Sequence, residues 1–295
     1  MKIIENRKIW FTISSIIIVL GLVMTALFGM NVGIDFSGGT ELQIEFDQPV
    51  EIDEIRQVTD NFDPNANINF IGPERTIVQI QTVDNLDSEA RQEVFNDFKE
   101  QYEHLDQAKD FNADFIGPRV GREIRNRALL AMLISAIGML LYISYRFELR
   151  FGLAAIAALI HDLLVVLAIY AIFRIPLNIS FVAAMLTVLG YSINDTIVVF
   201  DRIRENTRFI KKSNYEEIAN NSISQTITRS INTSITTLLT IGALFIIAPQ
   251  IRELTLPLIA GVLSGTYSSI FIASPVWVML KERQKQKKTG YTPKN

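Results

Sequence analysis

The sequence predicts a polytopic α-helical membrane protein with six transmembrane helices and a small α+β extracytoplasmic domain between the first two helices. The 295-residue chain is 49% hydrophobic, with a mean hydropathy of +0.25, which is high for a soluble globular protein. Its apolar residues form long runs, several of about 20 residues, enough to cross the hydrocarbon core as a helix.

The charges support the same fold class. Residues 33–118 hold 20 acidic and 5 basic side chains, whereas the remainder holds 11 acidic and 23 basic ones. This asymmetry places the acidic block and the basic flanks on opposite sides of a membrane. A soluble acidic domain tethered by a basic tail would not carry so many long apolar runs.

The N-terminal residues predict a cytoplasmic start followed by a membrane span. Residues 1–8 carry three basic side chains, and the apolar run 9–28 is predicted as the first transmembrane helix. A cleaved signal peptide fits the same combination of a basic start and an apolar run. The run is long for that role and no clear A-x-A cleavage site follows, which favours a retained helix.

Residues 29–127 are predicted to form the extracytoplasmic domain and its linker. The predicted elements are a strand at 35–46, a helix at 51–62, strands at 68–71 and 76–80, a helix at 88–105 and a strand at 111–116. Ser88 is the expected N-cap of the second helix. The order β-α-β-β-α-β is the ferredoxin-like pattern.

Residues 128–280 are predicted to hold transmembrane helices 2 to 6. The apolar runs are 128–145, 151–173, 179–200, 231–248 and 256–280. A cytoplasmic loop is expected at about 201–229 and a basic cytoplasmic tail at 281–295. Basic residues gather in these segments, which predicts a multi-pass protein of the cytoplasmic membrane with both termini inside. The arginines between 119 and 127 lie on the predicted outer side, although basic residues usually stay in cytoplasmic loops. This preference is weak next to long translocated domains.

Three residues predict features of the last helix and the tail. Pro275 is expected to kink the helix, and Gly261 and Gly265 form a small-residue face suited to close helix packing. The tail is expected either to touch anionic lipid or to act only as a stop-transfer flank.

Asp195 is the first candidate functional residue. It falls inside an apolar run, where an ionisable group costs about 2.5–3.5 kcal/mol on insertion scales. Such groups usually face a bundle interior or a water-filled path and mark ion or proton routes. Arg229 stands near the inner start of the next helix, so the two residues can lie at similar depth.

An Asp195–Arg229 pair predicts proton coupling. A nearby cation favours an ionised carboxylate and burial favours the protonated form. A motion that makes or breaks the pair therefore changes proton affinity. The alternative is a structural ion pair that fixes helix packing. Candidate polar support comes from Asn194, Thr196 and Asn232.

His161 and Asp162 form a second polar point, near the middle of the third helix. They are either a proton relay or an interhelical hydrogen bond, and the sequence does not separate these interpretations.

Enzyme motifs are missing from the sequence. It has no H-E-x-x-H zinc motif, no P-loop and no G-x-S-x-G, and it has no cysteine. No catalytic residue and no metal site is predicted.

Four motifs together resemble the SecD/SecF family. Residues 33–40 (GIDFSGGT) resemble its entry motif, and residues 190–205 (GYSINDTIVVFDRIRE) are similar to the fourth-helix signature of SecF. Residues 229–234 (RSINTS) resemble the start of the SecF fifth helix, and residues 265–271 (GTYSSIF) resemble its sixth helix. The first motif contributes the residues Gly33, Asp35, Phe36, Gly38, Gly39 and Thr40.

The resemblance implies a subunit of the SecDF accessory complex, half of an RND-type 12-helix arrangement. It implies that protons are the coupling ion, with no other cofactor, and that Asp195 and Arg229 carry the coupling. The implied partners are SecD, the SecYEG translocon, an unfolded polypeptide in transit and the lipid bilayer, with no nucleic acid. The implied function is proton-driven promotion of polypeptide export. The alternatives are half of a small-molecule RND-type exporter, for which the extracytoplasmic domain is small, or a purely structural subunit.

Overall fold

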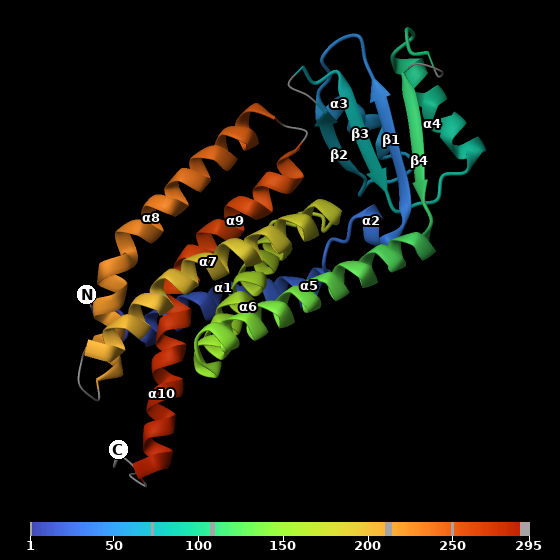
Figure 1. Ribbon diagram of the computed structural model, residues 1–295. Helices are drawn as coiled ribbons and strands as arrows, with labels where there is room; N and C mark the ends of the chain where they lie inside the picture. The colour runs from blue at the N-terminus through green and yellow to red at the C-terminus, as the bar shows by residue number, and fades with distance from the viewer. Residues whose placement is uncertain (1, 72–73, 107–109, 210–213, 249–250, 290–295) are drawn as a thin grey trace.

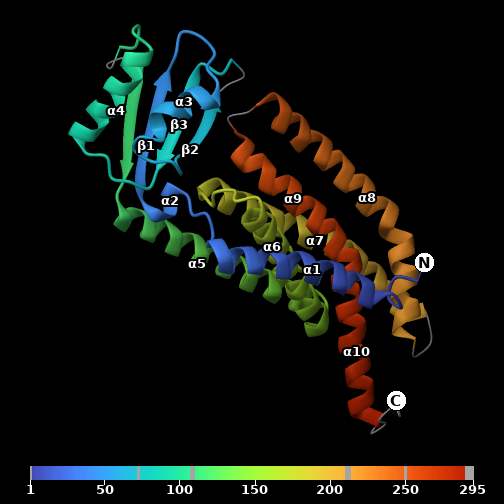
Figure 2. The same ribbon diagram turned by 180° about the vertical axis from the view of Figure 1, so that it is seen from behind.

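Among the residues that the structure describes, six helices are long and apolar enough to cross a membrane. They form a bundle, and a small sheet domain stands at one end of it (Figures 1 and 2). The computed structural model describes residues 2–71, 74–106, 110–209, 214–248 and 251–289. The spans are α1 (Arg7–Phe28), α5 (Pro118–Arg146), α6 (Leu149–Ile172), α7 (Ile179–Phe209), α8 (Tyr215–Ile247) and the continuous run from α9 to α10. The start of α1 and the end of α10 both lie away from the sheet.

The bundle has an inner and an outer set of helices. In α6, α7 and the α9–α10 run, 56% of the membrane-length window is buried, against 11% in α1 and α8 and 6% in α5. The three inner helices therefore pack mainly against other parts of this chain, where their polar side chains can find partners; unsatisfied polar groups are costly in lipid.

The last span bends in the middle. It consists of α9 (Arg252–Ser268), a π-helical turn (Ser269–Ala273) and α10 (Ser274–Thr289). The two helices run in different directions in both views (Figures 1 and 2). Pro275, just after the π-helical turn, lacks an N–H for the helical ladder, and π turns and prolines are the usual causes of sharp bends. The predicted kink is found at this place.

Gly261 and Gly265 bring α9 against α7. A Cβ at Gly261 would lie 2.3 Å from Val188 Cγ2, and one at Gly265 would lie 3.0 Å from Ser192 Cβ. Only a missing side chain permits this approach, so the predicted small-residue packing face is confirmed.

In the part of the chain that the structure describes, the sheet domain contains four strands and two covering helices, in the predicted order. The elements are β1 (Gly39–Glu45), α3 (Ile52–Thr59), β2 (Asn67–Ile71), β3 (Ile77–Thr82), α4 (Ser88–Gln101) and β4 (Phe111–Ile116). The strand order is β2-β3-β1-β4, with every neighbouring pair antiparallel. Leu42 pairs with Ile80 in this register, and both pack with Phe98 of α4 in a fully buried core.

The entry to the sheet differs from the prediction. The segment Ile34–Ser37 is a short helix, α2, so the strand starts only at Gly39. Gly38 (φ +82°) and Gly39 (φ +153°) turn the chain between them, and a Cβ at Gly39 would lie 2.2 Å from Thr82 O. Side-chain-bearing residues rarely adopt these angles. The cap of α4 also differs: Asp87, not Ser88, accepts the N–H of Ala90, at 2.9 Å.

Several membrane helices extend beyond their apolar runs. Pro118 starts α5 well before residue 128, a position where proline fits a helix N-terminus. The helix α7 continues to Phe209 and α8 begins at Tyr215, so most of the predicted loop at 201–229 is helical. Of the predicted tail, residues 281–289 belong to α10, and 290–295 lie outside the described residues.

Candidate functional site: buried carboxylates among the inner helices

Asp195 lies on α7 and is 5% exposed. Its Oδ2 accepts a hydrogen bond of 2.8 Å from Ser269 Oγ, at the first residue of the π-helical turn. Within the described part of the chain, no arginine or lysine forms an ion pair with it. The carboxylate is therefore held by one hydroxyl group in an apolar span.

Arg229 does not meet Asp195 in this structure. Its side chain is exposed, and its backbone carbonyl accepts a bond from Thr233 Oγ1. The buried face of α8 at this level is formed by Ser230 and Ser234. Ser234 contacts Tyr191 of α7 at 3.1 Å. Residues one apart in a helix point in different directions, so the face that packs inward turns Arg229 away.

The predicted polar neighbours divide between buried and exposed positions. Thr196 is buried beside Asp195, and its Oγ1 has no hydrogen-bond partner among the described residues. Asn194 and Asn232 are exposed, on α7 and α8. Of the three, only Thr196 is buried.

Asp162, on α6, is completely buried and has far more partners than Asp195. Its donors are three serine hydroxyls: Ser192 Oγ at 2.6 Å, Ser264 Oγ at 2.7 Å and Ser268 Oγ at 2.8 Å. His161 Nδ1 lies 3.2 Å away. The serines come from α7 and α9, so this carboxylate connects three inner helices.

His161 extends this network towards α1. Its Nε2 lies 2.8 Å from Ser14 Oγ, and its ring stacks on that of Tyr267 with centroids 5.8 Å apart. Tyr267 in turn donates a hydrogen bond of 2.8 Å to the carbonyl of Trp10. The polar cluster therefore runs from α1 through α6 to α7 and α9. The sequence pointed to His161 and Asp162 but did not identify the serines as their partners, although Ser192, Ser268 and Ser269 lie within the motifs at 190–205 and 265–271.

The glycine motif residues connect the bundle to the sheet. Asp35 Oδ2 accepts the N–H of Ile179, at the first residue of α7, at 2.8 Å, a favourable place for a carboxylate. Gly33 N donates to Leu177 O at 2.8 Å. Phe36 is buried against α6 and α7. Thr40 Oγ1 donates to Asp84 O and accepts from Leu86 N. These contacts give the motif a structural role at the domain junction.

Outside the spans, one acidic group near the N-terminus has a displaced pKa. A hydrogen bond from its own backbone N–H lowers the pKa of Glu5, with a smaller contribution from Asn220. Asn220 of α8 also accepts the N–H groups of Ile3 and Ile4, at 3.0 and 3.1 Å. The Asn220 side chain therefore holds Ile3 and Ile4 against α8.

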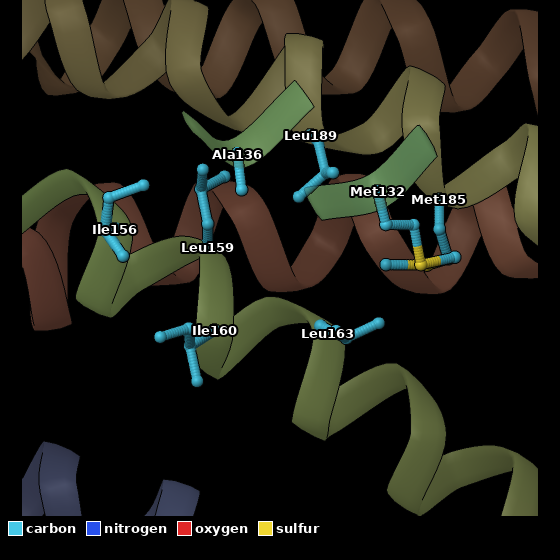
Figure 3. Close-up of a pocket in the computed structure, with 8 residues that line it drawn as sticks. All are labelled: Met132, Ala136, Ile156, Leu159, Ile160, Leu163, Met185 and Leu189. Carbon is cyan, nitrogen blue, oxygen red and sulfur yellow. The ribbon is translucent and has the colours of Figure 1, made fainter. Parts of the chain in front are cut away.

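A separate cavity of about 80 Å³ lies between α5, α6 and α7 (Figure 3). Its lining is wholly apolar: Met132, Ala136, Ile156, Leu159, Ile160, Leu163, Met185 and Leu189. It offers no group that could bind or pass a proton. No group of three or more metal-binding side chains occurs among the described residues.

Comparison with known proteins identifies the family. Residues 97–283 match "Protein export membrane protein SecD/SecF, C-terminal", and residues 23–50 match "SecD/SecF GG Motif". "Protein translocase subunit SecF" of Calditerrivibrio nitroreducens is 36% identical over 95% of this chain and 94% of its own length. The SecF of Thermobaculum terrenum is 39% identical over 93% of this chain and 92% of its own length.

Longer relatives contain this fold as one part. "Protein translocase subunit SecDF" of Bacillus subtilis is 34% identical over 96% of this chain, which spans 38% of that relative. The crystal structure of SecDF from Thermus thermophilus, titled a translocon-associated membrane protein, has a TM-score of 0.81 and 33% identity. It covers 96% of this chain, which spans 39% of that chain. The two single-chain relatives above, which match over nearly the full length, are both named SecF. The chain therefore belongs to the SecD/SecF family of protein-export membrane proteins.

Proposed function

We propose that this chain is a subunit of the SecDF accessory complex of the Sec translocon and uses the proton motive force to promote polypeptide export across the cytoplasmic membrane. The names of the relatives and the six membrane-length helices support this role. In the SecDF relatives, the part that matches this chain is less than half of a longer polypeptide. That arrangement supports a SecD-type partner, with which this chain would form the 12-helix RND arrangement beside SecYEG. The chain would act on an unfolded polypeptide without making or breaking covalent bonds.

The observation that carries proton coupling is the state of Asp195. A carboxylate that is 5% exposed within a membrane helix has one hydroxyl donor and no cationic partner among the described residues. Such a group is costly, and intramembrane carboxylates typically mark proton relays. Asp195 is therefore proposed as the residue that binds and releases the proton, the coupling ion of the complex.

Arg229 is proposed as its partner in another arrangement of the complex. An arginine on an exposed face of a membrane-length helix needs an anionic or polar neighbour. A rotation or shift of α8 that brings Arg229 to Asp195 would stabilise the ionised carboxylate and release its proton. The present structure would then correspond to the separated pair.

The sheet domain is proposed to be a ferredoxin-like, extracytoplasmic domain. The strand order β2-β3-β1-β4 inserts β3 between β2 and β1, and β1 between β3 and β4. This order fits two split β-α-β units. The acidic composition of residues 33–118 supports an outer location, and the ends of α1 and α10 opposite the sheet support cytoplasmic termini.

The test is Asp195→Asn, made in the full chain with SecD and SecYEG in membrane vesicles. We expect normal assembly with SecD and loss of the export that depends on the proton gradient. Glu123→Gln is the matched control, because Glu123 is an exposed carboxylate on α5 that pairs with Arg127 of its own helix. Normal gradient-dependent export by Asp195→Asn would refute the proton role and favour a purely structural subunit. Proton-driven export of a small molecule, without any effect on polypeptides, would favour the exporter alternative.

A further inference from the structure

Two consecutive serines join two buried carboxylates that belong to different helices. Ser268 Oγ donates to Asp162 Oδ2 on α6, and Ser269 Oγ donates to Asp195 Oδ2 on α7, each at 2.8 Å. All four side chains are at most 5% exposed. The proposed function uses Asp195 and leaves Asp162 without a role.

The surroundings of Asp162 suit an ionised carboxylate. Such a group has about four acceptor positions, and four donor groups surround it: three serine hydroxyls and, when Nδ1 carries a proton, His161. No arginine or lysine among the described residues forms an ion pair with it, so His161 is the side chain that can supply the balancing positive charge. The titratable side chains around the site are His161, Tyr267 and Asp195; α1 contributes Ser14.

Each of the two serines has one hydrogen and two acceptors. Ser269 Oγ lies 2.8 Å from Asp195 Oδ2 and 3.0 Å from Thr266 O. Ser268 Oγ lies 2.8 Å from Asp162 Oδ2 and 3.2 Å from Gly265 O. When a carboxylate is ionised, the serine hydrogen points to it. When the carboxyl group is protonated, its own hydrogen can be donated to the serine oxygen, and the serine hydrogen turns to the backbone carbonyl.

The serines stand where the helix is least regular. Ser268 ends α9, and Ser269 begins the π-helical turn that precedes the bend at Pro275. π-helical turns inside helices occur frequently at functional sites. Protonation of either carboxyl group therefore changes the hydrogen bonds of adjacent residues at a bend, and the backbone connects the two sites over one peptide unit.

We propose that Asp162 is a second proton-binding site, with His161 as its counter-ion, and that Ser268 and Ser269 couple its protonation to that of Asp195. This proposal rests on the proposed function, because it takes Asp195 as the first proton site. It adds a second carboxyl group, a balancing histidine and the connection between the two sites.

The test is a pH titration of the complex with SecD in membrane vesicles, followed by infrared difference spectroscopy of the carboxyl groups. We expect Asp162→Asn and Asp195→Asn each to remove a different titrating carboxyl signal. In each variant the midpoint of the remaining signal should shift by about one pH unit or more, the size that marks coupled sites. In Ser268→Ala/Ser269→Ala both signals should persist, and removing one carboxyl group should no longer shift the other.

Thr226→Ala is the control, because among the described residues this buried hydroxyl donates only to carbonyls of its own helix. It should leave both signals unchanged. His161→Gln keeps both carboxyl groups and should shift the Asp162 signal, which preserves the test if Asp162→Asn fails to fold. The proposal is overturned if Asp162→Asn removes no titrating signal, if His161→Gln shifts none, or if the Asp195 signal ignores the loss of Asp162. Normal export by Asp195→Asn would instead refute the proposed function, and the spectra would still report whether Asp162 titrates.

Discussion

Asn69 Nδ2 donates a hydrogen bond of 3.2 Å to Glu253 Oε1, and this contact joins β2 of the sheet domain to the first turn of α9. The other oxygen of Glu253 accepts a bond of 2.5 Å from Asn178 Nδ2, next to the start of α7. Glu253 thus links the sheet domain to the N-terminal ends of two inner helices, in addition to the contact of Asp35 with Ile179.

Removal of this contact should loosen the domain without unfolding it. We expect Asn69→Ala to broaden the distance distribution between spin labels at Glu93 on α4 and Ile246 on α8, both exposed. Asn67→Ala is the matched control, because Asn67 lies on the same strand and contacts Gln81 instead. Equal distance distributions for the two variants would show that the contact of Asn69 with Glu253 does not hold the sheet domain in place.

Gly261→Ala should destabilise the bundle. The new Cβ would lie 2.3 Å from Val188 Cγ2, a stiff and fully buried side chain. Overpacking of this kind costs about 1–3 kcal/mol, which thermal unfolding in detergent can measure. A Cβ at Gly242 meets nothing within 4 Å, so Gly242→Ala should be neutral or stabilising by up to about 1 kcal/mol. Similar melting temperatures for both variants would rule out close packing at Gly261.

Arg229→Ala should abolish gradient-dependent export and leave the stability of the chain unchanged. The side chain is exposed, and no ion pair joins it to another described residue, so its removal breaks no contact within the chain. Arg229→Lys keeps the positive charge and should retain part of the activity. Proton flux into vesicles and thermal unfolding separate the two effects. Lower stability with normal flux would assign Arg229 a structural role only.

Attachment of the N-terminal segment should weaken in acid. The pKa of Glu5 is lowered by its own backbone N–H and by Asn220. A group with a depressed folded pKa stabilises above its unfolded value, here near 4.5, and loses that contribution as the pH falls through the folded value. Hydrogen exchange at Ile3 and Ile4, relative to intrinsic rates, should therefore rise in this range.

The same exchange should be fast at every pH in Asn220→Ala, because Asn220 accepts both N–H groups. Asn221→Ala changes the exposed neighbouring position and serves as the control. Exchange that is unaffected by Asn220→Ala would show that other contacts hold the segment.

The sequence predicted the features that depend on local pattern. Long apolar runs predicted the six membrane-length helices, and period-two and helical spacing predicted the β-α-β-β-α-β order of the sheet domain. Gly261, Gly265 and Pro275 predicted close packing and a bend for the same local reason. Asp162 and Asp195 stood out because charge inside an apolar run is visible without a structure.

Helix boundaries followed the apolar runs less well. Polar turns of α5, α7 and α8 continue beyond the apolar residues, because a helix can form from polar residues that are not buried. Hydropathy reports where a chain can enter lipid, and caps and prolines decide where the helix ends.

The partners of the carboxylates were decided by tertiary structure alone. The position of Arg229 along the sequence predicted its depth in the bundle and left its direction open. The rotation of α8 turns Arg229 outward, while Ser230 and Ser234 pack inward. Serine hydroxyls carry little hydropathy signal. Their role as donors to the two carboxylates depends on the packing of α7 against α9 at Gly261 and Gly265, which brings together Ser192, Ser264, Ser268 and Ser269. The sequence by itself determined that two carboxylates are buried in the bundle. Which groups hold them depends on the packing of distant helices, because a hydrogen bond requires donor and acceptor to meet within about 3 Å.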